Sequence, residues 1–260
     1  IVEINTIRKR LSAVKGGRFA LACAPAHVES IILSDIIGDN PGMIASGPAC
    51  VDASTCEEAL ELVDKYKLKL SDRALELLKT ETPKELDNVK IMVTGGVSLL
   101  CQFAAEECEK YGYHPVILAD TLDCEAREAG WFMAAMARYR SGKGEKTALI
   151  AGGETIVHLT GKGMGGRNQE LALAAAEKIA GYDNITIISV GSDGTDGPTD
   201  AAGGCVDGRS KSVLAEQGVK IYDVLRENDA YHALQKCDGL VITGATGTNV
   251  NDIAIALIEG

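Results

Sequence analysis

Basic residues are scarce in this sequence. It has 26 lysine and arginine residues against 37 aspartate and glutamate residues, which gives a formal net charge of −11. A nucleic acid or an anionic membrane binds a basic protein face that releases counterions, so this balance excludes both classes of partner. A small anionic ligand would have to be bound by a few local cations.

Other features are missing as well, and each absence removes a class of protein. The eight cysteines form no C-x-x-C pair, and none has a histidine at zinc-ligand spacing, which excludes a disulfide framework and a structural zinc site. No apolar run reaches the roughly 18 residues of a membrane span and there is no signal-peptide pattern, so we expect a cytoplasmic protein. The motif G-x-x-x-x-G-K-[ST] is absent, which excludes a P-loop kinase.

Glycine, in contrast, is abundant. The 29 glycines exceed the usual share of about 7% and gather in short loops that follow apolar runs. Ligands of open α/β sheets bind beyond the carboxyl ends of the strands, so these loops are the candidate sites.

The apolar runs alternate with helical patterns, which is typical of an α/β protein with a largely parallel sheet. We predict strands at residues 19–24, 28–34, 90–94, 115–119, 147–151, 156–160, 185–190 and 240–243. We predict helices at residues 2–14, 56–66, 72–79, 99–111, 124–140, 168–180, 222–227, 230–237 and 250–259.

A polar stretch at residues 80–88 lacks apolar periodicity and marks the expected boundary between two lobes. We predict that residues 1–83 are the C-terminal remnant of an N-terminal Rossmann-like domain. Residues 84–260 are predicted to form a C-terminal α/β domain, a three-layer α/β/α structure with a mostly parallel mixed sheet. Because the chain opens at Ile1 without Met inside an expected helix, we expect that an upstream segment is missing.

The loop at residues 191–200 holds three carboxylates, those of Asp193, Asp196 and Asp200. Such carboxylates accept hydrogen bonds or hold a hard cation through oxygen. The alternative is a tight loop in which the aspartates make Asx-turns.

A second candidate lies between Gly152 and Asn168. Gly-Gly-Glu154 follows one expected strand, and the glycine-rich run 161–168 leads into a helix whose free N–H groups, together with Arg167, would bind an anion such as phosphate. The run also matches G-x-G-x-x-G, so a dinucleotide fold competes with this interpretation. The expected strand at residues 156–160 is short and polar, which favours a hairpin over the first strand of a βαβ unit.

Two further polar stretches follow expected strands. Residues 244–252 carry hydroxyls and amides at the start of the last expected helix, where Thr248 or Asn249 could simply cap that helix. In the first lobe, residues 35–39 and 46–48 fit a surface turn and a binding site equally well.

Taken together, these blocks resemble the bacterial and archaeal glycerate 2-kinase family over nearly the whole chain and in order. The blocks are Ile-Leu-Ser-Asp35-Ile-Ile-Gly-Asp with Ile44-Ala-Ser-Gly-Pro48, Gly-Gly-Glu154-Thr, Gly-Gly-Arg167-Asn-Gln-Glu-Leu-Ala-Leu, the Asp193 loop and Thr-Gly-Thr-Asn249-Val-Asn-Asp. Each string is loose, but the ordered set is specific.

The resemblance implies ATP-dependent phosphorylation of D-glycerate to 2-phosphoglycerate with Mg²⁺, in a cleft between two α/β domains. It implies that Arg167 acts on the transferred phosphate, that Asp193 or Glu154 binds the metal or serves as the base, that Asn249 orients a ligand, and that Asp35 reaches in from the other lobe. We assign ATP contacts to Gly165, Gly166, Gly194 and Thr248. The expected partner is the small molecule D-glycerate, with no nucleic acid and no membrane, and the assignment allows for a homodimer.

The family also has an N-terminal portion with a catalytic lysine and a Ser/Gly-rich nucleotide loop, and neither is present in these 260 residues. We therefore expect the chain to be incomplete for activity. Two alternatives stay open, an NAD(P)-dependent hydroxypyruvate reductase that uses the glycine motif and an inactive fragment.

Overall fold

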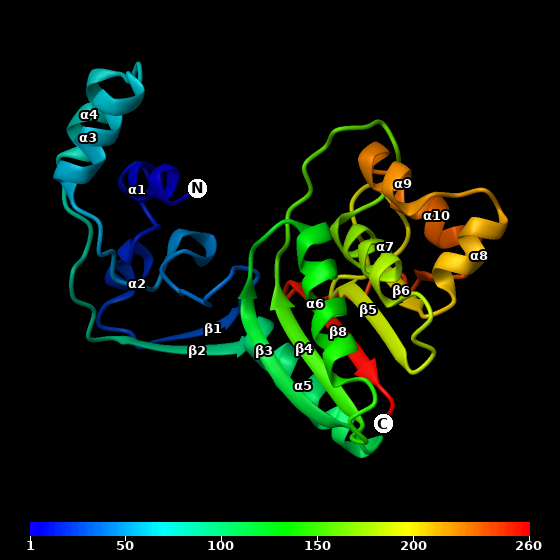
Figure 1. Ribbon diagram of the computed structural model, residues 1–260. Helices are drawn as coiled ribbons and strands as arrows, with labels where there is room; N and C mark the ends of the chain where they lie inside the picture. The colour runs from blue at the N-terminus through cyan, green and yellow to red at the C-terminus, as the bar shows by residue number, and fades with distance from the viewer. The chain divides into compact units, whose positions relative to one another are not determined.

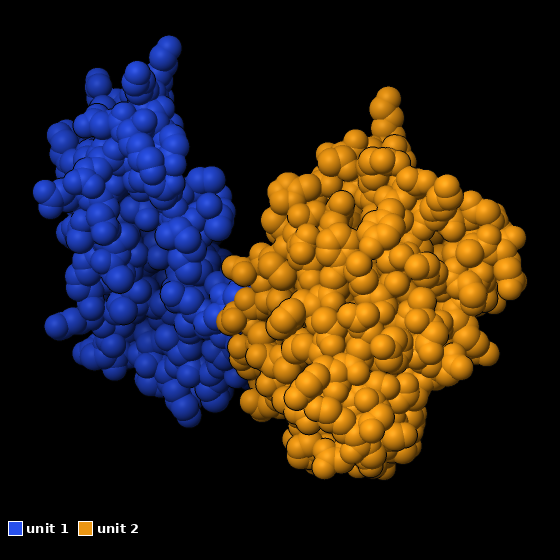
Figure 2. Space-filling model, in the orientation of Figure 1, with its two compact units in different colours: residues 1–95 blue, residues 96–260 orange.

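The computed structural model describes residues 1–260 and divides them into two compact units, residues 1–95 and residues 96–260 (Figures 1 and 2). This division falls twelve residues after the expected boundary at 83/84, because β2 pairs with β1 and so remains in the first unit. None of the helices has both the length and the apolar composition needed to cross a membrane.

The first unit consists of a two-stranded parallel sheet and several short helices. Its elements are α1 (Val2–Arg10), α2 (Arg18–Cys23), β1 (Val28–Leu33), the 3₁₀ helix η1 (Ile44–Ser46), α3 (Cys56–Tyr66), α4 (Asp72–Leu78) and β2 (Val89–Gly95). The strand expected at residues 19–24 is wrong, because this segment forms α2 and buries Ala20 on one side. A short apolar run does not distinguish a strand from a helix.

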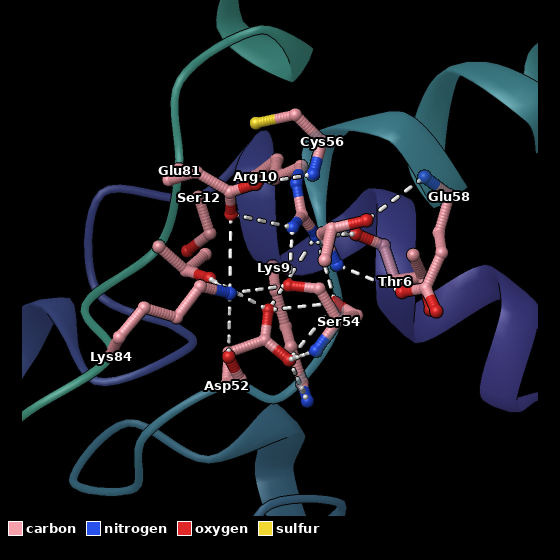
Figure 3. A network of polar contacts seen from close by, with 12 residues as sticks. Thr6, Lys9, Arg10, Ser12, Asp52, Ser54, Cys56, Glu58, Glu81 and Lys84 are labelled. Carbon is pink, nitrogen blue, oxygen red and sulfur yellow. Dashed lines mark hydrogen bonds and ion pairs between the residues drawn. The ribbon is translucent and has the colours of Figure 1, made fainter.

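A buried ionic network ties α1 to the two segments that flank α3 and α4 (Figure 3). The Lys9 ammonium lies 3.0 Å from Asp52, whose side chain is 1% exposed. The guanidinium of Arg10 contacts Asp52 at 3.5 Å and Glu81 at 3.2 Å. Burial alone would raise the pKa of Asp52, yet hydrogen bonds from Lys9 and Ser54 outweigh it and lower that pKa. The backbone N–H of residue 56 and the ammonium of residue 84 lower the pKa of Glu81 to about 2.

This network predicts an acid-sensitive first unit. The folded-state pKa of Glu81 and of Asp52 lies below the unfolded value, so their contribution is present above about pH 4 and is lost as the pH falls toward 2. We expect the melting temperature to drop by several degrees across that range, measured by thermal unfolding at stepped pH. Glu81→Gln should make the melting temperature fall less steeply with pH, whereas Glu57→Gln, at an exposed position of α3, should leave the wild-type dependence unchanged. The same dependence of melting temperature on pH in the wild type and both variants would contradict the prediction.

The second unit is a six-stranded sheet with helices on both faces (Figure 1). Its elements are α5 (Val97–Lys110), β3 (His114–Leu122), α6 (Ala126–Arg140), β4 (Thr147–Gly153), α7 (Arg167–Ile179), β5 (Ile185–Gly191), β6 (Gly203–Asp207), α8 (Ser210–Glu216), α9 (Ile221–Glu227), α10 (Ala230–Lys236), β7 (Leu240–Val241) and β8 (Asp252–Ile258). The predicted α/β class is confirmed.

The strand order is β3-β4-β8-β5-β6-β7. Only β3 and β4 form a parallel pair, and the other four ladders are antiparallel. It follows that β3, β4, β5 and β7 point the same way while β8 and β6 are opposed, so the predicted mixed sheet is mostly parallel in strand direction but not in its ladders.

Alternate residues of the central strands enter different cores, as the two-residue repeat of a strand requires. In β4, Ala148 and Ile150 pack with α5, whereas Leu149 and Ala151 pack with α6 and α7. Residues 168–176 of helix α7 are all buried, and residues 171–176 belong to the core that α6 and α7 share with the sheet. The helix that carries Arg167 is therefore fixed against the sheet.

Two expectations for this unit are wrong, and two of its elements were not predicted. Residues 156–160 form no strand beyond a single bridge between Ile156 and Glu125. The expected helix at 250–259 is the strand β8, because both faces of this central strand are covered and its apolar residues are almost continuous. Strand β6 was not predicted, because its glycines interrupt the apolar pattern of a strand. Glycine is required at position 203, because a Cβ there would lie 1.9 Å from the Ser189 carbonyl oxygen. The helix α8 was also not anticipated.

Candidate functional site

The sheet itself brings three of the polar segments to one edge. Strands β4 and β5 end at Gly153 and Gly191, and both of these residues pair with Asp252, the first residue of β8. Because β8 runs antiparallel between them, its amino end meets their carboxyl ends. Glu154, the loop after Gly191 and the end of the 244–251 segment are consequently neighbours.

Arg167, the first residue of α7, reaches this edge and is held there by two carboxylates. Its Nε and one terminal nitrogen donate to Asp252 at 2.5 and 3.0 Å, and its other terminal nitrogen lies 3.3 Å from Glu154. The hydrogen bonds to Asp252 raise the pKa of Arg167, although burial opposes them. Sequence reasoning missed Asp252 as a site residue; the signal available was its position as the last residue of the polar stretch at 244–252.

The start of α7 differs from the expected anion site. The carboxylate of Asp196, only 3% exposed, accepts the N–H of Asn168 at 3.1 Å and the N–H of Gln169 at 2.9 Å. The backbone groups that we expected to be free for a phosphate are thus taken by the chain itself. Burial raises the pKa of Asp196 even though these N–H groups favour its charged form. Asp196 therefore joins the 191–200 loop to the helix that carries Arg167.

Asp193 lies in the same loop and makes an Asx-turn, as the alternative interpretation of this loop had it. Its Oδ1 accepts the N–H of Thr195 at 2.9 Å, and its carbonyl accepts the N–H of Thr246 at 3.1 Å. The Oδ1 atoms of Asp193 and Asp252 both lie within 3.4 Å of the point where a side chain at Gly191 would begin. The structure therefore places Asp193 beside the Arg167–Asp252 pair.

The 244–251 segment is a loop before a strand rather than a helix start. Asn249 is exposed, and its Oδ1 accepts the N–H of Asn251 at 3.2 Å. The buried Asn251, which sequence reasoning also passed over, directs its amide toward Glu154 at 3.4 Å. The exposed Thr248 donates its N–H to Thr246 at 3.4 Å. Asn249 and Thr248 therefore lie in the same loop as Asn251, which contacts Glu154.

The glycines at residues 161–166 pack against other segments of the chain and do not face open space. A Cβ at Gly161 would lie 2.3 Å from Glu227 backbone atoms, and one at Gly163 would lie 2.4 Å from the Asp229 side chain. A Cβ at Gly166 would meet Asp196 at 2.3 Å. These glycines are required by close approach of two chain segments. With no strand at 156–160, the dinucleotide interpretation loses the βαβ unit that it needs.

Metal binding by the protein alone is not favoured at this edge. No three His, Cys, Asp or Glu side chains are placed together to hold a metal ion. Protein-bound Mg²⁺ usually takes one or two carboxylates and completes its shell with waters and substrate phosphates. Asp193 and Glu154 together supply two carboxylates, the number that such an ion takes from a protein.

The remaining predicted residues have less distinctive surroundings. Asp35 follows β1 in the first unit, where its side chain is exposed. A Cβ at Gly165 would lie 3.3 Å from Ala230, which is a tight contact, and a Cβ at Gly194, at φ 85°, would lie 2.0 Å from the Gly244 carbonyl oxygen.

Comparisons with known proteins cover almost the whole chain. The MOFRL family matches residues 147–252, and a domain of unknown function, DUF4147, matches residues 1–79. A D-glycerate 2-kinase from Thermotoga maritima is 49% identical over 99% of this chain and 63% of its own length. A putative hydroxypyruvate reductase from Agrobacterium vitis is 39% identical over 99% of this chain and 69% of its own.

A solved structure agrees with the sequence comparison. The crystal structure of a glycerate kinase from Thermotoga maritima superposes with a TM-score of 0.96 at 49% identity, covering 99% of this chain and 63% of that one. The chain thus spans a little under two thirds of the Thermotoga relatives that it matches.

Proposed function

The chain belongs to the glycerate 2-kinase family, and on that premise we propose that it takes part in the ATP-dependent phosphorylation of D-glycerate to 2-phosphoglycerate. The observation that carries the proposal is the guanidinium of Arg167, held by Asp252 at the edge of the sheet. Phosphoryl transfer demands positioning and charge neutralisation more than covalent chemistry.

Arg167 is suited to the transferred phosphate. Its bond to Asp252 fixes the plane of the guanidinium, while its contact with Glu154 joins two partly exposed groups, 36% and 46% of whose side chains are exposed. A phosphate oxygen can replace Glu154 at that nitrogen without disturbing the pair with Asp252. Arginine grips phosphate oxygens in a fixed geometry, which a lysine does not.

The net charge of the side chains around Arg167 supports a role for magnesium. Asp193, Glu154 and Asp252 bring three negative charges against the single positive charge of Arg167. Two anionic substrates need further cations in such surroundings. Mg²⁺ held by Asp193 or Glu154 would neutralise phosphate charge, and the other of these two carboxylates would accept the proton of the glycerate hydroxyl.

The other assignments complete the proposal. Asn249 orients a ligand from its exposed loop, and Asp35 is the residue of the first unit that the family resemblance assigns to the site. Gly165, Gly166, Gly194 and Thr248 offer backbone groups to ATP.

The name of the Agrobacterium relative makes hydroxypyruvate reduction the second candidate. That chemistry would need a nicotinamide site, and the glycine motif available for it is packed against Glu227, Asp229 and Asp196. We therefore rank the kinase reaction first.

The two candidates predict opposite assay results for the complete gene product. We expect D-glycerate and MgATP to release ADP, and we expect enolase to consume the product without added phosphoglycerate mutase, because only the 2-phosphate is an enolase substrate. Chelation of the metal should stop the reaction. Hydroxypyruvate-dependent NADH oxidation without ADP release would overturn the proposal.

A further inference from the structure

Gly161 and Gly163, the first two glycines of the motif at residues 161–166, have no part in the proposed reaction, yet the loop that carries them is held by a dense set of contacts. The turn between α9 and α10 supplies them. The Gly163 N–H donates to the carbonyl of Glu227 at 2.8 Å, and the Met164 N–H donates to the Asp229 side chain at 2.9 Å. Gly161 and Gly163 lack side chains where this turn lies against them.

Asn228 is the centre of these contacts. It is 6% exposed and adopts a left-handed conformation, φ 54°, which asparagine tolerates. Its Oδ1 accepts the N–H groups of Thr160 at 2.7 Å and Gly161 at 2.9 Å. Its Nδ2 donates to the His158 carbonyl at 3.2 Å and to Glu170 at 3.1 Å. Because two donors face one end and two acceptors face the other, the amide has only one workable orientation.

Glu170 carries the connection to the candidate site. It lies on α7 one turn after Arg167 and is 2% exposed. Its other partner is Arg127 of α6, at 3.0 Å, and the next charged group facing it is Glu125, which pairs with the same arginine. Burial raises the pKa of Glu170, while Asn228 and Arg127 favour its charged form.

Two segments that bracket Arg167 therefore meet at one side chain. The loop before Arg167 is fixed to the Oδ1 of Asn228, and the helical turn after it is fixed to the Nδ2. We propose that Asn228, with Glu170 and the glycines that let the loop approach, forms a clamp that sets the position of Arg167 for phosphoryl transfer. The inference rests on the proposed function, and Asn228 and Glu170 act in it as positioning residues.

Asn228→Asp tests the clamp, since it keeps the shape, the tolerance of φ and the Oδ1 acceptor. At neutral pH it sets a second carboxylate against Glu170 and removes the donor. We expect kcat for D-glycerate to fall about 50-fold, because a misplacement near 1 Å costs roughly 100-fold, with both KM values changed less than about threefold. As the pH is lowered from about 8 to 6, the ratio of variant to wild-type kcat should rise, because a shared proton then restores a donor between the two carboxylates.

A double variant separates positioning from general destabilisation. If Asn228 acts through Arg167, Asn228→Asp added to Arg167→Lys should cost no more than Arg167→Lys alone. Asn184→Asp, at a partly exposed asparagine just before β5, should match the wild type at every pH. The wild type and the four variants are assayed as complete gene products, after thermal melts confirm folding.

The outcomes distinguish the two proposals. Wild-type protein without glycerate-dependent ADP release would overturn the proposed function and the clamp with it. Active wild type with additive losses in the double variant, or with a variant-to-wild-type ratio that is flat in pH, would overturn the clamp alone.

Discussion

Replacing Arg167 by lysine is expected to lower kcat of glycerate phosphorylation by about 10³-fold, the lower end of the effect of an arginine that stabilises a transferring phosphoryl group. Lysine keeps the charge but not the fork of donors that pairs with Asp252 on one side and is free for phosphate on the other. Because the contact is made in the transition state, kcat and kcat/KM should fall together.

Steady-state rates of ADP release at saturating substrates measure this effect. The matched control is Arg209→Lys, because Arg209 is an exposed arginine that also pairs with an aspartate, Asp207. It should retain wild-type activity within about twofold. An Arg167→Lys protein that keeps more than a third of wild-type kcat would remove Arg167 from the mechanism.

Removing the carboxylate of Asp196 should destabilise the second unit by about 3 kcal/mol. Asp196→Ala leaves the N–H groups of Asn168 and Gln169 without a partner in a buried place, and each such orphan costs about 1–3 kcal/mol. Urea unfolding curves for wild type and variant give the difference. Activity should fall as well, because the start of α7 loses its link to the Asp193 loop.

Asp200→Ala is the control from the same loop. Asp200 is exposed and accepts only the hydroxyl of Tyr231, at 2.8 Å, so its loss should cost less than about 0.5 kcal/mol. An equal decrease in the free energy of unfolding for Asp196→Ala and Asp200→Ala would show that the buried hydrogen bonds of Asp196 contribute nothing to stability.

The pH dependence of the Asp196 effect has a definite sign. Burial raises its folded-state pKa above the unfolded value, so the protonation-dependent part of its contribution to stability is fully present below the unfolded pKa and is lost as the pH rises through the folded pKa. The stability gap between wild type and Asp196→Ala should therefore widen as the pH is lowered from 7 toward about 4. A gap that narrows would contradict the raised pKa.

The candidate site was only partly visible in the sequence. Glu154, Arg167 and Asp193 could be named because each lies in a glycine-rich polar loop directly after a strand or before a helix, and the structure brings them together. Asp252 and Asn251 could not, because they were assigned to the first turn of a helix that does not exist. Their importance depends on a pairing register between β8 and two strands distant in sequence.

The glycine motif shows the opposite error. Its spacing suggested a phosphate or a dinucleotide, since glycine permits close approach of a ligand. The partner that approaches is the turn at residues 227–229, more than sixty positions later in the chain. Nothing local distinguishes a glycine that faces a ligand from one that faces another segment of backbone.

The sequence by itself determined the α/β class, most of the helices and the polar loops after strands, because apolar periodicity and turn residues act over a few neighbouring positions. Only the tertiary structure decided that β8 is a strand, that Asp196 rather than a ligand occupies the start of α7, and that Asn228 joins the loop before Arg167 to the helix after it. These are contacts between segments far apart in sequence, and their identity depends on which faces of the sheet and helices are covered.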